Sequence, residues 1–467
     1  MSSLTAIPGF DGELVGPGDA TYDAHRELWN AMVDRRPALI ARCATATDVA
    51  VAIRRGREAG LEIGVKCGGH GVLGLAVPEG GLMIDLTPMD EVRVDPQLRR
   101  AWVQGGALLR YLDRATEPHG LATTAGNVSH TGVGGLTLGG GMGWLARQFG
   151  LACDNVESYT VVTADGETVR ATATENPDLF WGLRGGGGNF GVVTEFVFRL
   201  HPFAGDALLV DFYFDPFDQT AATAMRSWRD LLPDAPREAM FTSDTMTAGE
   251  APFLPKRLHG RPVVTTGFVW TGDIGAGKAY LETFRSRIPG AVSEQVEETR
   301  YIQLQSSGDE RHHHGLRRYS AGHYHAELSD EAIDAYLARG ILAGAPEPDW
   351  SLMPGGGFQA YGGAIAEVAP EDSAFSYRNT LVEFFGGATW ADPSEDAERM
   401  ARARTWAKTL EPFSIGTYVN VISDPGADEV VRAYGAGQMA RLVELKRKYD
   451  PENVFHLNQN IRPAPPI

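Results

Sequence analysis

Short apolar runs and amphipathic stretches alternate through the first two hundred residues. The apolar runs predict buried strands, whereas stretches in which apolar residues recur every three or four positions predict helices. Strands are expected at 38–41, 61–65, 82–86, 101–104, 156–163, 168–171 and 192–200, and helices at 22–33, 47–59, 108–118 and 176–183. This half of the chain is therefore typical of a mixed unit of helices and strands.

The pattern changes after His201 and Pro202, where longer runs alternate between apolar and polar residues. Strands are predicted at 207–214, 262–271, 357–368, 381–390 and 417–422, and helices at 220–231, 277–288, 330–342, 394–410 and 427–449. Long strands separated by helices in this order favour an α+β unit with a largely antiparallel sheet.

Three glycine-rich loops interrupt the predicted elements of the first half, at 65–71, 126–143 and 184–194. Eight of the eighteen residues in the longest loop are glycine. Because glycine has no Cβ, such backbone can lie directly against a flat or phosphorylated ligand and can adopt positive φ. We interpret the three loops as parts of one large cofactor site.

Length and charge narrow the possible functions. A chain of 467 residues favours two domains, and its three cysteines form no disulfide framework. The net charge of −18 argues against nucleic acid or an anionic membrane as partner. The chain starts without the basic and apolar regions of a secretory signal, and no apolar run reaches the length of a membrane span. We therefore expect a cytoplasmic protein.

Two stretches match the residue patterns of phosphate-binding motifs. Gly186, Gly188 and Gly191 match a dinucleotide fingerprint, but a helix precedes them and a strand follows, which reverses the required order. The stretch 272–278 matches most of a P-loop between a strand and a helix, but Ala279 stands where serine or threonine would bind Mg²⁺. A solvated turn is favoured there, and a P-loop nucleotide-binding protein is kept as a remote alternative.

Histidines fall into two groups. His312–His314, His323 and His325 are close in sequence, but adjacent side chains do not easily converge on one ion and no carboxylate stands at ligand spacing. We expect structural or surface roles for them and no metal site. His70, by contrast, lies in Gly-Gly-His-Gly, where an imidazole can be a base, a donor or a nucleophile toward an electrophilic cofactor carbon.

Several motifs together resemble one protein family. They are Lys66–His70, Gly126–Gly143, Asn176–Trp181, Arg184–Thr194 and Tyr449–Asn460. In this order they resemble the berberine-bridge-enzyme-like FAD-linked oxidases of the vanillyl-alcohol-oxidase superfamily, over nearly the whole chain. The stretches 35–43 and 128–131 are more similar still to a bacterial flavin oxygenase type from polyketide biosynthesis.

The resemblance implies an α+β, two-domain flavoprotein. A FAD-binding domain would comprise 1–203, with its PCMH-type part at about 35–203. A substrate-binding domain at 204–412 would carry an antiparallel sheet covered by helices. The C-terminal segment, 413–467, would return to the FAD-binding domain.

The resemblance also implies FAD bonded covalently to His70 through the flavin 8α-methyl. Many relatives add a second bond through a cysteine, but Val128 stands at that position, so a single bond is expected. Leu136 stands where relatives often carry a histidine near the flavin N1/C2 edge, so Lys66 or loop N–H groups would stabilise the reduced flavin. Cys67 is expected to be a small buried residue. The other expected cofactor contacts are Gly68, Gly69, Gly71, Ser129, Thr131, Gly132, Gly134, Gly135, Gly139, Gly141, Gly143, Gly191, Val192, Val193, Asn458 and Asn460.

Catalytic candidates follow from the same resemblance. Tyr418 and Asn420 match the family's Tyr-x-Asn motif, and residues two apart on a strand share a face. Tyr418 can act as a general base if a cationic neighbour lowers its pKa, with simple packing as the alternative. Glu383 and Gln359 lie on strands expected to line the substrate pocket and can assist.

We therefore expect an oxidase that removes a hydride from a C–H bond and passes electrons to O₂. Aromatic residues in the second half favour a cyclic or polyketide-like substrate of secondary metabolism, with a carbohydrate as an alternative. Thr131 and Leu136 are expected to border an apolar niche for O₂, which leaves oxygenation through a flavin–oxygen adduct open. A nonproductive flavin-storing relative is the non-enzymatic alternative. Partners are a small molecule and O₂, and both a monomer and a homodimer remain open.

Overall fold

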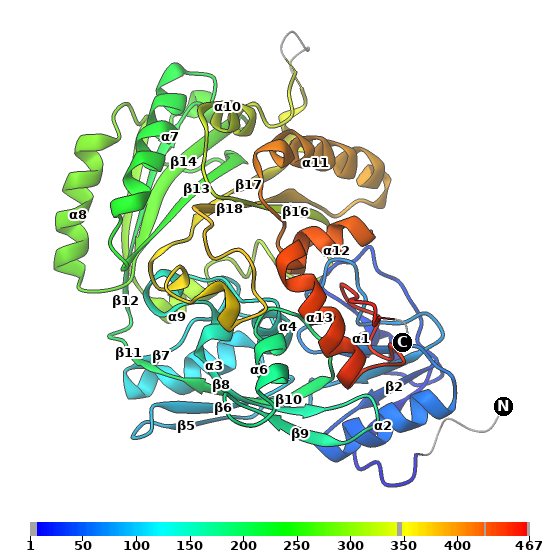
Figure 1. The fold of residues 1–467 in the computed structure, drawn as a ribbon. Helices are drawn as coiled ribbons and strands as arrows, with labels where there is room; N and C mark the ends of the chain where they lie inside the picture. Colours follow the sequence, from blue (N-terminus) through cyan, green and yellow to red (C-terminus); the bar gives the residue numbers. More distant parts are fainter. Residues whose placement is uncertain (1–6, 343–347, 425, 465–467) are drawn as a thin grey trace.

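The chain forms two bodies of sheets and helices, and its C-terminal segment returns to the first body (Figure 1). The computed structural model describes residues 7–342, 348–424 and 426–464. In Figure 1 the blue and cyan N-terminal part and the red C-terminal helices lie together, and the green and yellow part forms the second body. Helices combined with antiparallel sheets fit the predicted α+β class, while the boundaries near 203 and 412 stay a prediction.

Three parallel strands and one antiparallel strand form the first sheet. Their order is β1 (Glu13–Val15), β2 (Leu39–Arg42), β4 (Leu82–Asp85) and β3 (Ile63–Lys66). Helix α1 (Tyr22–Arg26) precedes β2, and helix α2 (Ala46–Glu58) supplies the crossover between parallel strands β2 and β3. Thr45 and Asp48 form a reciprocal capping box at the start of α2. Strand β3 ends where the first glycine loop begins.

Five antiparallel strands form the second sheet. Their order is β5 (Val92–Asp95), β6 (Arg100–Gln104), β10 (Val192–Arg199), β8 (Val156–Val162) and β9 (Thr168–Ala171). A two-stranded sheet adds β7 (Leu121–Ala122) and β11 (His201–Pro202). The helices of this region are α3 (Leu109–Thr116), α4 (Val133–Leu138), α5 (Ala146–Phe149) and α6 (Pro177–Leu183). Helix α4 lies inside the longest glycine-rich stretch, for which only a loop was predicted.

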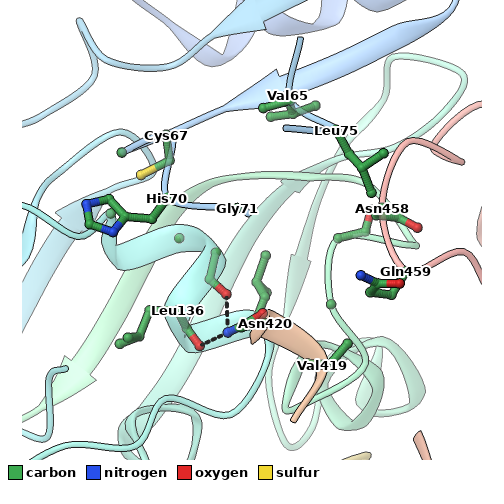
Figure 2. Close-up of a pocket in the computed structure, with 18 of the residues that line it drawn as sticks. Val65, Cys67, His70, Gly71, Leu75, Leu136, Val419, Asn420, Asn458 and Gln459 are labelled. Atoms are coloured by element: carbon green, nitrogen blue, oxygen red, sulfur yellow. Dashed lines mark hydrogen bonds between the residues drawn. The ribbon is translucent and has the colours of Figure 1, made fainter. Parts of the chain in front are cut away.

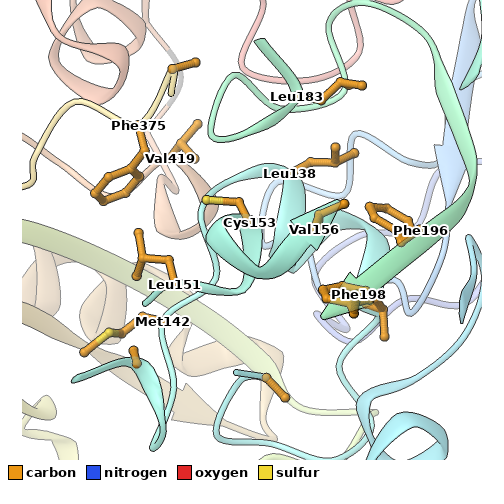
Figure 3. Close-up of a cluster of buried hydrophobic side chains, with 14 of the residues drawn as sticks. Leu138, Met142, Leu151, Cys153, Val156, Leu183, Phe196, Phe198, Phe375 and Val419 are labelled. Carbon is orange, nitrogen blue, oxygen red and sulfur yellow. The ribbon is translucent and has the colours of Figure 1, made fainter. Parts of the chain in front are cut away.

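An apolar core anchors the longest glycine loop (Figure 3). Leu138 and Met142 of the loop share this core with Phe196 of β10. Phe375 of the second body and Val419 of the C-terminal segment belong to the same cluster. Because segments distant in sequence share one core, packing across the two bodies sets the position of the loop.

Seven antiparallel strands form the sheet of the second body. Their order is β15 (Ser293–Arg300), β12 (Asp206–Phe214), β14 (Pro262–Trp270), β13 (Ala239–Thr247), β17 (Gly355–Ala360), β18 (Val382–Trp390) and β16 (Arg317–His325). Helices α7 (Gln219–Leu231), α8 (Ile274–Arg287), α10 (Asp330–Ala338) and α11 (Asp396–Leu410) cover one face (Figure 1), and the short helix α9 (Tyr301–Ser306) follows β15. Val210 and Phe212 pack in the core that includes α7 and α8, so Asp211 between them belongs to the opposite face.

The sequence prediction lacks seven of the described strands, namely β1, β5, β7, β11, β13, β15 and β16. Strand β15 is an edge strand whose residues are exposed or half-buried, so it carries no apolar alternation. In β13, the buried positions include Ser243 and Thr245, which hides the period that marks a strand. Polar residues in these strands are stabilised by partners that the sequence alone does not reveal.

Several predicted boundaries are wrong. The strand expected at 417–422 is replaced by a 3₁₀ turn at Val419–Val421. The helix expected at 427–449 divides into α12 (Ala427–Tyr434) and α13 (Ala436–Tyr449) because Gly435, with φ of +74°, interrupts it. The helix expected at 22–33 ends at Arg26, and the strand expected at 357–368 ends at Ala360.

A buried ion pair holds the C-terminal segment on the first body. The Lys446 Nζ lies 2.6 Å from the Asp450 carboxylate and donates to the carbonyls of Asn189 and Phe455 at 2.8 and 2.9 Å. Both side chains are fully buried. The Asp450 carboxylate also accepts the backbone N–H of Val454. These bonds join α13, the third glycine loop and the final segment.

The P-loop match is not a loop in the structure. Helix α8 begins at Ile274, and the Asp273 side chain caps it by accepting the N–H of Ala276. Lys278 lies within the helix and pairs with Glu298 at 2.6 Å. The stretch therefore lacks the phosphate cradle of a nucleotide hydrolase. Within the described ranges, no helix combines the length and the apolar character that crossing a membrane requires.

Candidate functional site

A cavity of about 420 Å³ opens where the three glycine loops meet (Figure 2). The first loop contributes the wall from Cys67 to Ala76, and the second contributes residues of α4. The third loop and the C-terminal segments around Tyr418 and Asn458 complete the wall. Its volume lies in the range of small-molecule and cofactor sites.

Most residues expected to bind a cofactor line this cavity. They are Cys67, Gly68, Gly69, His70, Gly71, Thr131, Gly132, Gly134, Gly135, Leu136, Gly191, Val192, Val193 and Asn458. Tyr418 and Asn420, expected to be catalytic, line it as well. Burial raises the pKa of the Cys67 thiol to about 11, so this residue is unreactive at neutral pH.

Other expected residues lie outside the lining. The Lys66 ammonium donates to the backbone carbonyl of His25 at 2.6 Å, and its role toward a reduced flavin stays a prediction. Ser129 binds the Asp309 carboxylate through its N–H and its hydroxyl, at 3.0 and 2.6 Å. Val128 lies beside Gly308 of the second body.

The glycines of the three loops serve two purposes. A Cβ at Gly139, Gly141 or Gly143 would collide with Asn420, Ala152 or Ala125, so these positions are small because the chain packs on itself. A Cβ at Gly71, Gly135 or Gly188 would meet no protein atom within 4 Å, and all three residues line the cavity. Backbone at these three positions therefore borders open space, as a cofactor cradle requires.

Unpaired polar atoms lie in the C-terminal segment, where Asn458 lines the cavity and Asn460 lies outside its lining. The Oδ1 atoms of Asn458 and Asn460 are buried and have no protein partner. Buried polar atoms normally have a hydrogen-bond partner, and an unpaired one calls for an explanation. A ligand rich in hydroxyl and N–H donors, such as a dinucleotide, would satisfy Asn458 directly.

His70 sits in the cavity wall among other rings. Its imidazole stacks on Trp29, with centroids 4.7 Å apart and planes 16° from parallel. Its Nε2 lies 2.8 Å from Nδ1 of His130, and its Nδ1 lies 3.4 Å from the Thr131 hydroxyl. Burial, followed by the neighbouring His130 and His314, lowers the pKa of His70 well below its usual value. The imidazole is therefore neutral, which is the nucleophilic form.

The ring of His314 also borders this pair. One ligand nitrogen each from His70, His130 and His314 lies within 4.8 Å of the others. However, the 2.8 Å between His70 and His130 is a hydrogen-bond length, shorter than the roughly 3.3 Å that separates two nitrogens around a tetrahedral zinc ion. The geometry thus favours a hydrogen-bonded pair with a third ring beside it.

Sequence reasoning missed three residues of this site: Trp29, His130 and His314. His130 stands within the longest glycine loop, so its place there was a usable signal. His314 was given a structural or surface role, and its side chain is indeed exposed, but its ring centroid is 5.7 Å from that of His70. Trp29 lies in coil before the first glycine loop and gives no sequence signal.

A polar row crosses the sheet of the second body. Tyr324, Glu383 and Gln359 pair directly across β16, β18 and β17, and directly paired residues share a sheet face. Burial raises the pKa of Glu383 to about 7, although its bond from the Tyr361 hydroxyl, at 2.8 Å, opposes this shift. The Gln359 side chain accepts from Asn127 of the longest glycine loop at 3.2 Å. The row is thus linked to the loop beside the cavity.

Tyr418 connects the cavity to this row. Its ring lies 6.2 Å from that of Tyr324, and its oxygen accepts from the Asn420 amide at 3.0 Å. Asn420 also donates to the Gly135 carbonyl at 3.3 Å, a contact near the centre of Figure 2. Burial, followed by the nearby Glu383, raises the pKa of Tyr418 instead of lowering it. The cation that would make Tyr418 a base is absent from these contacts, so Tyr418 is a neutral hydroxyl.

Sequence comparisons agree with this geometry. Two family models match the chain, the FAD binding domain at residues 37–172 and the berberine and berberine-like family at residues 417–462. The (R)-6-hydroxynicotine oxidase of Paenarthrobacter nicotinovorans is 30% identical over 479 residues, covering 99% of each chain. The chain belongs to the berberine-bridge-like FAD-linked oxidoreductases. FAD-linked oxidoreductase pgmH of Aspergillus terreus is 39% identical over 468 residues, covering 95% of this enzyme and 92% of pgmH.

Solved structures share the fold of this oxidoreductase. The 6-hydroxy-D-nicotine oxidase of Arthrobacter nicotinovorans superposes with a TM-score of 0.82 at 26% identity, covering 99% of this chain and 100% of that one. A glucooligosaccharide oxidase of Acremonium strictum, described for a novel flavinylation, gives 0.83 at 26% identity and 97% coverage of both. The predicted two-domain, vanillyl-alcohol-oxidase-type fold is therefore confirmed, and so is FAD as the cofactor.

Proposed function

We propose that this oxidoreductase oxidises a C–H bond of a small cyclic substrate bound between the cavity and the polar row. The observation that carries this proposal is Glu383, a buried carboxyl with a pKa near 7 beside the cavity's Tyr418. A carboxyl of this pKa is half ionised at neutral pH, which suits a general base. FAD, when bound, supplies the acceptor for the hydride, and O₂ takes the electrons afterwards.

The remaining residues hold and orient the substrate. Tyr418 and Asn420 line the cavity as neutral donors, so they can hold a hydroxyl or amine of the substrate. Glu383 accepts the proton released from that group, and the Tyr361 hydroxyl stabilises the carboxylate form. Burial of this cluster excludes water and preserves the shifted pKa.

The apolar lining residues that FAD leaves free favour an apolar, cyclic substrate. Phe385 lines the cavity with 40% of its surface exposed, and Leu136 and Val419 line it nearby. Large exposed aromatic surface inside a pocket is suited to stacking on a ring. The name of the relative (R)-6-hydroxynicotine oxidase agrees with a cyclic substrate.

A carbohydrate is the second candidate. Asp211 and Asp244 lie on the same face as the polar row, and burial raises the pKa of both carboxyls, that of Asp211 to about 7. Carboxyl groups of this kind can accept bonds from sugar hydroxyls. The glucooligosaccharide oxidase found by comparison agrees with this reading.

A panel of substrates tests the proposal. Cyclic amines and cyclic alcohols are expected to bleach the flavin absorbance under anaerobic conditions and to release H₂O₂ in air, and oligosaccharides are expected to do neither. Turnover of oligosaccharides alone would move the assignment to the second candidate. Flavin that no compound of either class reduces would contradict the oxidase proposal.

The proposal also covers the way in which the flavin is attached. We infer that His70 carries the cofactor through one covalent bond, because its neutral imidazole lines the cavity. Val128, at the position of the second attachment in relatives, offers no nucleophile and lies beside the second body instead. A single bond is therefore expected.

If O₂ reaches the flavin through an apolar niche beside Leu136, a change at this residue should alter the rate of flavin reoxidation. Leu136 lines the cavity as an apolar side chain, and the neighbouring Thr131 hydroxyl faces His70. Replacing Leu136 with Phe should fill the apolar niche and slow flavin reoxidation by about tenfold, or about 1.4 kcal/mol in the barrier. Stopped-flow mixing of reduced enzyme with O₂ measures this rate, and anaerobic reduction by substrate serves as the internal control. Reoxidation at the unchanged rate would show that O₂ uses another route, and ¹⁸O in the product would indicate oxygenation.

A further inference from the structure

His70 is paired with His130, and the Asp309 charge acts on His130 in turn. His70 Nε2 and His130 Nδ1 are 2.8 Å apart. The charge of Asp309 acts on His130, and its carboxylate is fixed by two bonds from Ser129, the residue before His130. Burial lowers the pKa of His130, and the Asp309 charge is the largest effect that opposes this shift. A nucleophile, a base within hydrogen-bond reach and a third group that supports the base form the usual arrangement for activating a nucleophile.

The surroundings of His70 make a proton acceptor necessary. When a neutral imidazole forms a bond to carbon, it becomes positively charged unless it loses its N–H proton. His70 lies at the cavity wall, stacked on Trp29, and the Arg318 guanidinium lies 4.0 Å over the same Trp29 ring. Burial and the neighbouring His130, His314 and Arg318 all disfavour positive charge on His70. The proton must therefore leave, and His130 is the group that contacts its Nε2.

We propose that His130 is the proton acceptor for attachment of FAD at His70, with Asp309 as its positioning residue. This inference rests on the proposed covalent bond to His70. In the step, one C–H bond of the flavin 8α-methyl and the N–H bond of His70 break, and one N–C bond forms. The two electrons stay on the flavin, and O₂ then takes them with the two released protons to give H₂O₂.

An exit for the proton is also present. His130 Nε2 is buried and forms no well-aligned hydrogen bond in the described structure, although the nearby Asp309 backbone raises the pKa of His130. The ring of His314 lies beside it, with centroids 5.4 Å apart, and His314 is exposed. A proton taken at Nδ1 of His130 can therefore leave from Nε2 toward His314 and solvent. Neither His130 nor His314 lines the cavity, which separates this path from substrate oxidation.

His130→Gln tests the inference directly. Glutamine keeps hydrogen-bonding groups but is not a base, so total FAD per protein should stay at the wild-type value. Covalent attachment should be about 10²-fold slower or more, as expected for loss of a general base. The fraction of FAD retained after acid precipitation is followed from induction onward, and then in purified enzyme kept with excess FAD. His119→Gln, at an exposed position in a remote turn, is the matched control and should behave as wild type.

Asp309→Asn tests the positioning role through pH. His130 faces Asp309, Arg110 and Arg318 as well as the imidazoles of His70, His314 and His312. Removing the Asp309 charge lowers the proton affinity of His130. The midpoint at which attachment accelerates with rising pH should therefore shift downward, and the rate at the plateau should fall. A loss caused only by disturbed folding would lower FAD content without moving the midpoint.

The possible outcomes distinguish failure of this inference from failure of the proposed covalent bond to His70. Wild-type enzyme that releases all its FAD into acid overturns the covalent bond and, with it, the role of His130. Wild-type enzyme with covalent FAD and a His130→Gln variant that attaches FAD at the same rate overturn only the inference. If His130→Gln loses FAD altogether, His130→Asn is measured in the same assay, and wild-type kinetics there would also overturn it.

Discussion

Glu383→Gln is expected to lower the rate of flavin reduction by substrate by about 10²–10⁴-fold, the range for loss of a general base. Glutamine has nearly the same shape and can still accept the Tyr361 hydroxyl, so the fold and FAD content should be retained. A carboxyl must be ionised to accept a proton. In the wild type, reduction should therefore accelerate as pH rises through about 7, the raised pKa of Glu383. The variant should lose this dependence.

Anaerobic stopped-flow reduction across pH measures both effects. Asp113→Asn is the matched control, because burial also raises the pKa of this carboxyl to about 7. Asp113 accepts from Gln305 at 3.1 Å and does not line the cavity. A Glu383→Gln enzyme that reduces at the wild-type rate would remove Glu383 from the mechanism, as would an equal loss in Asp113→Asn.

Lys446→Met is expected to destabilise the enzyme by about 3–5 kcal/mol, the usual cost of breaking a buried ion pair from one side. Lys446 is fully buried and makes three bonds, so its removal leaves the Asp450 carboxylate uncompensated and frees two backbone carbonyls. Because one of those carbonyls belongs to Asn189 of the third glycine loop, FAD binding should weaken as well. Denaturant unfolding and the FAD-to-protein ratio measure the two effects.

Lys448→Met is the control for this change. Lys448 pairs with Asp178 at 2.5 Å, but more than half of its side chain is exposed. Exposed pairs contribute about 0–1 kcal/mol, so this variant should be nearly as stable as wild type. Equal destabilisation in both variants would show that burial does not increase the contribution of the Lys446–Asp450 pair to stability.

Much of the fold was predictable where apolar residues follow a regular period. Strands β8 and β10 and helices α2 and α7 lie within one or two residues of the predicted ranges. Strand β15 was not predictable because its side chains remain in solvent, so no apolar period exists to detect. The break at Gly435 depends on a single positive φ inside an otherwise helical pattern.

The sequence predicted which backbone segments form the site, but it did not predict the pKa values and pairings of the side chains there. Glycine-rich loops indicate that a ligand approaches the backbone closely, and His70 lies within one of these loops. The pKa of Glu383 depends on burial under a second body, and the pairing of His70 with His130 depends on two loops meeting. Tyr418 shows the same limit, because its motif indicated a base whereas its surroundings raise its pKa. Such properties arise from contacts between segments far apart in sequence.

Mass analysis of the acid-denatured enzyme tests the central claim most directly, namely that FAD occupies the glycine-loop cavity and is bonded once, to His70. The account predicts that the denatured protein stays yellow, that its intact mass exceeds the polypeptide by one FAD, and that digestion places the flavin on the peptide containing His70. His70→Ala should release all its FAD into acid. Wild-type protein that loses its flavin to the acid supernatant, or carries it on a peptide without His70, would contradict the account.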